Sequence, residues 1–386
     1  MTDMTYRKRK KLAAVCTSVT GVLLAGVLAG TSVAWSSFDM ISQFMNQETY
    51  KVVYEDGSEI VPKKYNSDYA DMNQLQADET EYAKVVQSEG SVLLQNKNLP
   101  LASGGKVTLL GYDSAEANFL VSGGGSGSID TSKTPSLMAA FEEAGFEVNP
   151  VMWDFYENGN GVSSYATDKV NEPAVSLYGS EEIASFDDYH DAAIVFIGRK
   201  GSEGSDVFTK TSDDETRSML NLSQNELDLI DLATEHFDNV VVVLNTMNAM
   251  ELGELESRNV SVIWVGAGGQ QGVGAIPEIL NGTRTPSGHL VDTYAYDSFS
   301  SPAMQNFGDF TMTYGENNYK YYNYAEGIYV GYKYYETRYA DKVYGTGNAG
   351  EFDYAAEVQY PFGYGLSYAD FSYSNFTVEE ANDTFE

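Results

Sequence analysis

Short runs rich in aliphatic residues alternate with segments of helical spacing along the middle of this chain. Four runs are typical of buried strands and lie at residues 106–111 (KVTLLG), 192–198 (AAIVFIG), 239–245 (NVVVVLN) and 260–265 (VSVIWV). Helical spacing occurs at residues 79–89, which run into SVLLQN, and at 136–144, 223–236, 250–255 and 272–280. The helix at 223–236 begins with the capping box Ser223-Gln-Asn-Glu226. Because such alternation forms right-handed βαβ units, the pattern predicts an α/β fold with a mainly parallel sheet flanked by helices.

A different pattern occupies the N-terminus, where five basic residues (7–11) precede an almost uncharged run at residues 12–35. As a helix rising about 1.5 Å per residue, this run reaches roughly 36 Å and can cross a bilayer core of about 30 Å. The positive-inside rule predicts a cytoplasmic segment at 1–11, a single transmembrane anchor at 12–35 in the cell membrane, and an extracellular remainder. A signal peptide cleaved after Ala34, giving a secreted protein, is the alternative. We favour the anchor because the run is longer than a usual signal core.

The rest of the chain divides by composition. Residues 36–75 are polar without a sustained period and are interpreted as a spacer, and the α/β pattern occupies residues 76–300. Residues 301–360 are rich in tyrosine and lack a regular period, so we expect a packed irregular connection there. Exposed aromatic faces also serve sugar binding, but the packing of half-buried loops is the default interpretation of these tyrosines.

Charge and the rarer residue types exclude several classes of function. A formal net charge of -33 argues against nucleic acid as a partner, because such binding needs clustered Lys and Arg. The single cysteine, Cys16, lies in the apolar N-terminal run, so the folded part has no disulfide or thiolate chemistry. The histidines at 190, 236 and 289 form no metal set, and the acidic triplet at 213–215 is interpreted as a solvated turn. We therefore predict neither a metal nor a cofactor, and the absence of a GxSxG motif disfavours a serine hydrolase.

The polar loop RKGSEGSD at residues 199–206 directly follows the apolar run at 192–198. Open α/β folds bind ligands at the carboxyl edge of the parallel sheet, which is where such a loop is delivered. The loop holds Glu203 between small residues, which would let a substrate approach closely. Taken alone, the segment is better described as an ordinary acidic surface turn.

Six short sequence motifs, taken together, indicate which family of α/β domains this chain resembles. They are SEGSVLLQN (88–96) with LPL (99–101), GGGSG (123–127), SEGSD (202–206), PSGHL (286–290), EGIYVGY (326–332) and YPFGYGLSY (360–368). In this order and spacing they resemble the C-terminal α/β sandwich domain of glycoside hydrolase family 3, the β-glucosidase and exo-glycosidase family. In that family the last string lies where the sandwich is followed by a fibronectin type III-like domain, so the resemblance implies that residues 361–386 begin such a domain.

The resemblance implies a retaining, exo-acting β-glucosidase of carbohydrate metabolism that acts on an oligosaccharide or β-glycoside. Family members have an Asp nucleophile on a (β/α)8 barrel and an acid/base Glu on a loop of the sandwich, and Glu203 matches the acid/base position. A general acid must stay protonated near neutral pH, and Asp206 is a neighbour able to raise the pKa of Glu203. The resemblance implies that Gly125, Ser126 and Gly127 frame the sugar pocket, and a flexible turn is the alternative. Lys200 is a further substrate-binding candidate, although solvation of the loop is its default interpretation.

The chain departs from the family pattern because no stretch of about 250 residues remains for a (β/α)8 barrel. The family nucleophile is a Ser-Asp or Thr-Asp followed by Trp, whereas Trp153-Asp154 is reversed and Ser67-Asp68 precedes Tyr69 in the spacer. We therefore expect no nucleophile in this chain, and a barrel domain as its partner, encoded downstream in an inverted-order, membrane-anchored enzyme or on a separate chain. The alternative is a non-catalytic surface module that binds carbohydrate or is structural.

Overall fold

The computed structural model describes residues 2–38, 42, 68–122, 129–159, 169–201, 207–307, 310–378, 380–381 and 384–385. The chain divides into two compact units, Met1–Ala70 and Asp71–Glu386. The predicted site residues Gly125, Ser126, Gly127, Glu203 and Asp206 lie outside the described residues.

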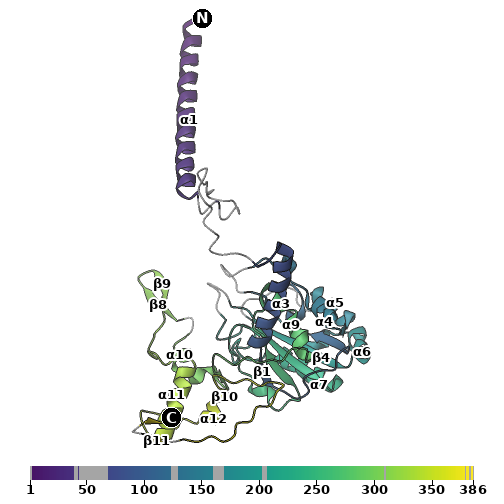
Figure 1. Cartoon of the computed structure of the whole chain (residues 1–386). Coiled ribbons are helices and arrows are strands. Elements are labelled where there is room, and N and C mark those ends of the chain that lie inside the picture. The colour runs from purple at the N-terminus through teal and green to yellow at the C-terminus, as the bar shows by residue number, and fades with distance from the viewer. Residues whose placement is uncertain are drawn as a thin grey trace, which may run out of the picture. The chain divides into compact units, whose positions relative to one another are not determined.

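The first unit contains one long helix, α1 (Thr2–Ser36), drawn in purple in Figure 1. Within it, Tyr6–Ser36 contains an 18-residue window with a mean hydropathy of 2.2 and is long and apolar enough to cross a membrane. Its apolar side chains are exposed, as Leu23 and Val27 illustrate. A signal sequence near the N-terminus has the same features. The anchor and the cleaved signal therefore both stay predictions.

The second unit is built around a six-stranded sheet in the order β1-β6-β5-β4-β2-β3. Its strands are β1 (Val92–Gln95), β2 (Lys106–Leu110), β3 (Glu147–Val148), β4 (Ala192–Arg199), β5 (Val240–Thr246) and β6 (Ser261–Trp264). In the sheet, β3, β2, β4, β5 and β6 lie side by side in this order, and each pair of neighbours is parallel. β1 pairs antiparallel with β6. The predicted α/β fold with a mainly parallel sheet is confirmed. The carboxyl ends of the parallel strands meet at one edge of this sheet.

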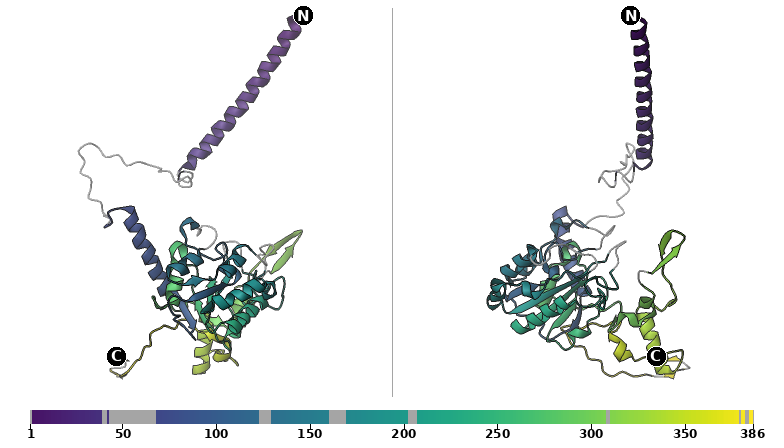
Figure 2. Two further views of the ribbon diagram at one scale, coloured as in Figure 1. Left: turned by 90° about the vertical axis from the view of Figure 1, so that its right-hand side faces the viewer. Right: turned by 180° about the vertical axis from the view of Figure 1, so that it is seen from behind.

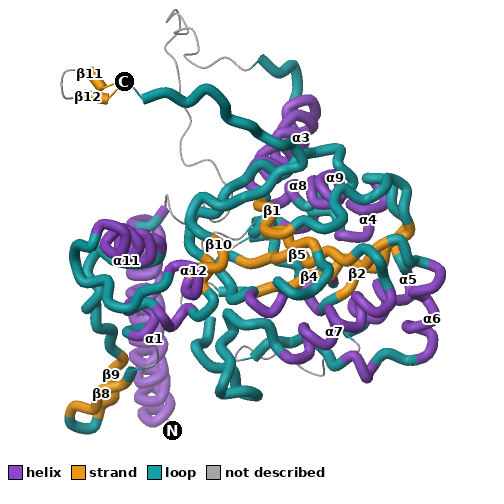
Figure 3. The backbone as a smooth tube through the Cα atoms, turned by 90° about the horizontal axis from the view of Figure 1, so that it is seen from below, coloured by secondary structure: helices purple, strands orange, loops and turns teal. Residues whose placement is uncertain are grey.

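Helices cover both faces of the sheet (Figure 3). They are α3 (Met72–Gly90), α4 (Leu137–Glu143), α5 (Pro150–Glu157), α6 (Ser180–Asp188), α7 (Gln224–His236), α8 (Gly269–Gly272) and α9 (Ala275–Leu280). Successive side chains of a strand point to opposite faces. Phe196 of β4 therefore packs with Phe141 of α4 and Ile279 of α9, whereas the adjacent Val195 packs on the side of Leu227 of α7. Two apolar cores result, one on each face.

Three of the predicted helices differ from the structure. Helix α3 begins at Met72, inside the segment assigned to the spacer, because the Asp71 side chain caps it by accepting hydrogen bonds from two backbone N–H groups. The predicted helix at 250–255 is wrong, since only a 3-10 turn, η5 (Gly253–Leu255), forms there. The predicted helix at 272–280 begins only at Ala275, as α9, and a separate short helix, α8, ends at Gly272. At this break the Lys84 side chain of α3 fills the space that a Cβ atom on Gly274 would need.

The tyrosine-rich segment is more regular than expected, and the expectation of an irregular connection at 301–360 is wrong for much of it. It contains α10 (Pro302–Gln305), β8 (Thr311–Tyr314), β9 (Asn317–Lys320), α11 (Tyr332–Tyr344), α12 (Tyr354–Glu357) and β10 (Val358–Tyr360), which pairs with β7 (Tyr294–Ala295). Figure 2 shows the β8–β9 hairpin extending away from the sandwich. Tyr335 of α11 is buried in a small core with Phe352, whereas Tyr314 and Tyr324 are exposed. Packing thus accounts for only some of these tyrosines.

The YPFGYGLSY string at 360–368 lies against the edge of the sheet formed by β1. The Tyr364 hydroxyl donates to the Leu94 carbonyl at 3.2 Å, and the Tyr368 hydroxyl donates to the Ile279 carbonyl at 2.9 Å. Beyond this string, residues 369–378 have no helix or strand. The strands β11 (Glu380–Ala381) and β12 (Thr384–Phe385) are two residues each. The start of a fibronectin-like domain stays a prediction.

Candidate active site

Strand β4 places the candidate acid/base loop at the carboxyl edge of the sheet. It lies between β2 and β5, and its side chains from Ala192 to Ile197 are fully buried. The strand ends at Arg199, and Lys200 is the one predicted site residue that the structure describes. Because Glu203 and Asp206 are not described, the role of Glu203 stays a prediction. The structure instead defines the groups that hold the start of this loop at the end of β4.

Arg199 anchors the end of β4 to the start of α7. Its side chain is 1% exposed, and its guanidinium donates to both carboxylate oxygens of Glu226 at 2.8 Å. It also donates to the Asn221 carbonyl at 2.8 Å. The same Glu226 carboxylate closes the capping box by accepting from the Ser223 backbone N–H at 2.8 Å. Burial alone would lower the pKa of Arg199, but the Glu226 carboxylate raises it above its ordinary value.

Asp113 holds the backbone of β4 one residue before Arg199. It lies in the 3-10 turn η1 (Tyr112–Ser114) that follows β2, and its carboxylate accepts a hydrogen bond from the Gly198 N–H at 2.8 Å. A Cβ atom on residue 198 would collide with this carboxylate, so the contact requires glycine. Burial raises the pKa of Asp113 to about 6, although the positive charges of Lys200 and Arg199 oppose the shift.

Glu172 is a second buried acid at this edge. Its carboxylate accepts from the Tyr112 backbone N–H at 2.6 Å and from the Tyr156 hydroxyl at 3.2 Å, and the residue is 6% exposed. Burial raises the pKa of Glu172 well above its ordinary value, and the nearby charges of Glu226 and Asp113 raise it further. The edge next to the candidate loop therefore contains two carboxyl groups with raised pKa values.

Two cavities flank the loop, one at each end. The first, the Lys200 cavity, has a volume of about 450 Å³ and is lined by Lys200, Glu116, Glu157 and by residues on both sides of the glycine loop at 123–128. Asn245 of β5 fixes one side of that loop, because its side chain accepts from the Leu120 N–H at 2.5 Å and donates to the Leu120 carbonyl at 2.9 Å. Burial lowers the pKa of Lys200, and Asp113 opposes the shift.

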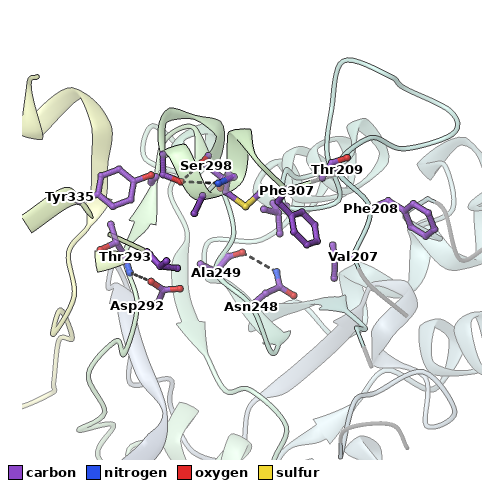
Figure 4. Close-up of a pocket in the computed structure, with 17 residues that line it drawn as sticks. Val207, Phe208, Thr209, Asn248, Ala249, Asp292, Thr293, Ser298, Phe307 and Tyr335 are labelled. Carbon is purple, nitrogen blue, oxygen red and sulfur yellow. Dashed lines mark hydrogen bonds between the residues drawn. The ribbon is translucent and has the colours of Figure 1, made fainter. Parts of the chain in front are cut away.

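The second, the Phe307 cavity, has a volume of about 320 Å³ and begins at Val207, the first described residue after the loop (Figure 4). Its lining comes from four segments that are far apart in the sequence: residues 207–220, 248–249, 292–307 and 330–335. The candidate loop therefore joins one cavity, through Lys200, to the other, through Val207.

Most of the groups that build this edge are not predicted from the sequence. The sequence indicates Arg199 only as a loop residue and Glu226 only as part of a helix cap, and it does not single out Asp113 or Glu172. The available signal was position, since Arg199 ends a strand and Asp113 follows one by three residues. The partner of each buried charged side chain depends on tertiary contacts. Arg199 and Glu226, for example, are 27 residues apart in the sequence.

Comparison with known proteins identifies the domain. Residues 91–332 match the glycosyl hydrolase family 3 C-terminal domain. The chain is 28% identical over 301 residues to thermostable beta-glucosidase B of Acetivibrio thermocellus, covering 77% of this chain and 34% of that protein. It is 29% identical over 304 residues to a beta-glucosidase of Ruminococcus albus, covering 76% of this chain and 28% of that protein.

Solved structures agree with these matches. Beta-glucosidase 3B of Thermotoga neapolitana, solved in complex with glucose, superposes with a TM-score of 0.61 at 26% identity and covers 79% of this chain and 40% of its own. A beta-glucosidase of Paenibacillus barengoltzii superposes with a TM-score of 0.60 at 27% identity, and the match covers 78% of this chain and 30% of that one. The chain thus spans about a third of the length of the curated relatives it matches. We conclude that the chain belongs to glycoside hydrolase family 3, whose C-terminal α/β domain it contains.

Proposed function

We propose that this chain supplies the acid/base domain of an exo-acting, retaining β-glucosidase, with Glu203 as the general acid/base. The observation that supports this most is the position of the loop, which follows a fully buried central strand at the carboxyl edge of the sheet. Ligands of open α/β sheets bind at that edge. The beta-glucosidase names of the relatives point to the same reaction.

The proposed reaction has two steps that use one carboxyl group in two protonation states. In the first, the protonated Glu203 gives its proton to the glycosidic oxygen while a second carboxylate attacks the anomeric carbon and the bond to the leaving group breaks. In the second, ionised Glu203 takes a proton from a water molecule, which attacks the anomeric carbon and releases the sugar. A raised pKa suits the first step. The raised pKa values of Asp113 and Glu172 at the same edge support an environment of this kind.

The remaining groups have proposed roles in binding and in assembly. Lys200, with the glycine loop that contains Gly125, Ser126 and Gly127, would bind sugar hydroxyls across the Lys200 cavity, and Asp206 would help to keep Glu203 protonated. Retaining hydrolysis requires a second carboxylate about 5 to 5.5 Å from the first. We propose that it comes from a (β/α)8 barrel domain, which follows this chain in an inverted-order enzyme or is encoded separately.

The test is the hydrolysis of phenyl β-D-glucoside by the complete enzyme. Glu203→Gln keeps the size of the side chain and removes the acid, so kcat/KM should fall by about 10²- to 10⁴-fold. Glu215→Gln is the matched control, because Glu215 is an exposed acid in the same connection and should leave the rate unchanged. An unchanged rate in Glu203→Gln would reject this carboxylate. No hydrolysis by the wild-type enzyme, together with sugar binding, would favour the non-catalytic carbohydrate-binding module.

We further propose that α1 anchors the enzyme in the cell membrane, with residues 1–11 in the cytoplasm and the sandwich domain outside. The length and mean hydropathy of Tyr6–Ser36 support a span. Membrane fractionation followed by N-terminal sequencing separates the two interpretations. Intact residues 1–11 in the membrane fraction would support the anchor, and a soluble protein that begins at Trp35 would show cleavage after Ala34.

A further inference from the structure

The β8–β9 hairpin has one face that is rich in tyrosine. Residues that stand directly opposite each other in an antiparallel pair point to the same face. Met312 is opposite Tyr319, and Tyr314 is opposite Asn317. The pairing continues one step beyond the strands, because the Tyr321 backbone N–H donates to the Phe310 carbonyl at 3.1 Å. One face, which we call the tyrosine face, therefore consists of Phe310, Met312, Tyr314, Asn317, Tyr319 and Tyr321.

The tyrosine face is exposed, which is the reverse of the usual arrangement. The other face of the hairpin is polar and consists of Thr311, Thr313, Asn318 and Lys320. A hairpin packed on a core normally turns its apolar face inward. Here the aromatic and methionine side chains of the tyrosine face are exposed, from 37% for Phe310 to 77% for Tyr314. Because the hairpin extends away from the sandwich (Figure 2), this face is open to a ligand.

The side chains of the tyrosine face form a row along the hairpin. The rings of Phe310 and Tyr321 lie side by side, with centroids 5.8 Å apart and an angle of 33° between their planes. Tyr319 and Tyr321 are each about half exposed, so neighbouring side chains hold them while part of each ring stays accessible. At about 3.4 Å per residue, the face is about 14 Å long from Phe310 to Tyr314. Several sugar rings of one chain fit along this length.

We propose that the tyrosine face binds a neutral polysaccharide, with pyranose rings stacked on Tyr314, Tyr319 and Tyr321. A β-linked glucose unit presents C–H groups on the faces of its ring and hydroxyls around its rim. Aromatic rings pack on such C–H faces, and tyrosine adds a hydroxyl at its tip. The Asn317 amide, on the same face, can both donate to and accept from sugar hydroxyls. The family of this chain consists of glycosyl hydrolases, so a glycan is the ligand that this chemistry suits.

Charge and size favour a neutral glycan over other partners. The tyrosine face contains no charged side chain, and the net charge of -33 would repel an acidic polymer. A stable protein–protein interface uses about 20 to 30 residues on each side, whereas the tyrosine face offers six. A protein partner would therefore need many contacts outside the hairpin. A polysaccharide needs only a row of accessible rings.

The experiment measures the binding of the full chain, in lipid nanodiscs, to swollen cellulose, an insoluble neutral β-glucan. Wild type should sediment with the cellulose and not with carboxymethyl cellulose beads, an anionic form of the same polymer. Tyr314→Ala and Tyr319→Ala should each raise the Kd for cellulose by about threefold to tenfold, because each removes one ring contact. Tyr344→Ala is the matched control, because Tyr344 has the same exposed fraction as Tyr314, 77%, but lies on α11. Circular dichroism establishes that each variant is folded.

A second variant at the same position tests stacking itself. Tyr314→Phe keeps the ring and removes only the hydroxyl, so it should retain most of the binding that Tyr314→Ala loses. A loss as large as in Tyr314→Ala would refute stacking. Glu203→Gln should bind cellulose as wild type does, because Glu203 is no part of the tyrosine face. The binding result is therefore independent of the test of catalysis.

Three other outcomes would overturn the proposal. The first is a wild-type chain that does not sediment with cellulose, or Tyr314→Ala and Tyr319→Ala variants that bind as wild type does. The second is an equal loss of binding in Tyr344→Ala, which would show general adhesion of exposed tyrosines. The third is a wild-type dimer that Tyr314→Ala dissociates, without binding to cellulose, which would assign the tyrosine face to a second copy of the chain.

Discussion

The hydrogen bond between Asp113 and Gly198 predicts how the stability of the sandwich domain changes with pH. The pKa of the Asp113 carboxyl rises from 3.8 to about 6 because the folded protein buries it. The folded state therefore binds a proton more tightly than the unfolded state does. This contribution to stability is fully present below about pH 4 and is lost as the pH rises through about 6.

The magnitude follows from the two pKa values. Each tenfold change in proton affinity is worth about 1.4 kcal/mol, so the difference between 3.8 and about 6 corresponds to about 3 kcal/mol over the whole range. Solubility is lowest near the isoelectric point of about 4.2, so measurements should start near pH 5. Between about pH 5 and about pH 7.5, the same relation leaves a change of about 1.4 kcal/mol.

Asp113→Asn isolates this effect, because asparagine is nearly the same size, can still accept from the Gly198 N–H and does not titrate. The assay is urea unfolding of the full chain in nanodiscs, followed by the fluorescence of Trp153 and Trp264 in the sandwich. The free energy of unfolding of Asp113→Asn minus that of wild type should rise by about 1.4 kcal/mol between about pH 5 and about pH 7.5. A difference that stays constant across this range would refute the raised pKa. A pKa lowered by Lys200 and Arg199 would give the same constant difference, because the carboxyl would then be ionised in the folded and unfolded states throughout this range.

Two further predictions concern the same edge of the sheet. Arg199→Ala should lower the free energy of unfolding by about 3 to 5 kcal/mol, because it leaves the Glu226 carboxylate buried without its partner. In the same urea assay, the double variant Arg199→Met with Glu226→Leu should recover most of the lost free energy of unfolding. If the double variant is as unstable as Arg199→Ala, the charges themselves are needed. Gly198→Ala should cost about 1 to 3 kcal/mol, because the added Cβ atom meets the Asp113 carboxylate. In an Asp113→Gly background, Gly198→Ala should lower the free energy of unfolding much less. An equal loss in the Asp113→Gly and wild-type backgrounds would show that the added Cβ atom clashes with some other group.

The core of the fold could be predicted from the sequence because each inner strand is marked by its own residues. β4 and β5 are runs of buried aliphatic side chains, and α7 begins at the capping box formed by Ser223 and Glu226. The short β1 could not be placed, because four residues do not indicate that they pair antiparallel with β6. Helix α11 was missed because its sequence is dominated by tyrosine and charged residues, and only Tyr335 in it is buried.

The site was only partly predictable, and the reason is physical. The position of Glu203 follows from a local motif after a strand, which sequence reasoning can detect. The supporting contacts join residues that are distant in the chain, as when Asp113 meets Gly198 across the sheet and Tyr156 meets Glu172. The Phe307 cavity is formed by segments spread from Val207 to Tyr335, so no single stretch of sequence indicates it.

The central claim, that Glu203 is the general acid, is tested most directly by the dependence of the rate on the leaving group. The complete enzyme and its Glu203→Gln variant would be compared on phenyl β-D-glucoside, whose leaving group needs protonation, and on 2,4-dinitrophenyl β-D-glucoside, whose leaving group departs without it. If Glu203 is the general acid, kcat/KM of the variant falls by about 10²-fold or more on the phenyl substrate and far less on the dinitrophenyl substrate. An equal loss on both substrates would contradict it, because the lost side chain would then act on something other than proton donation.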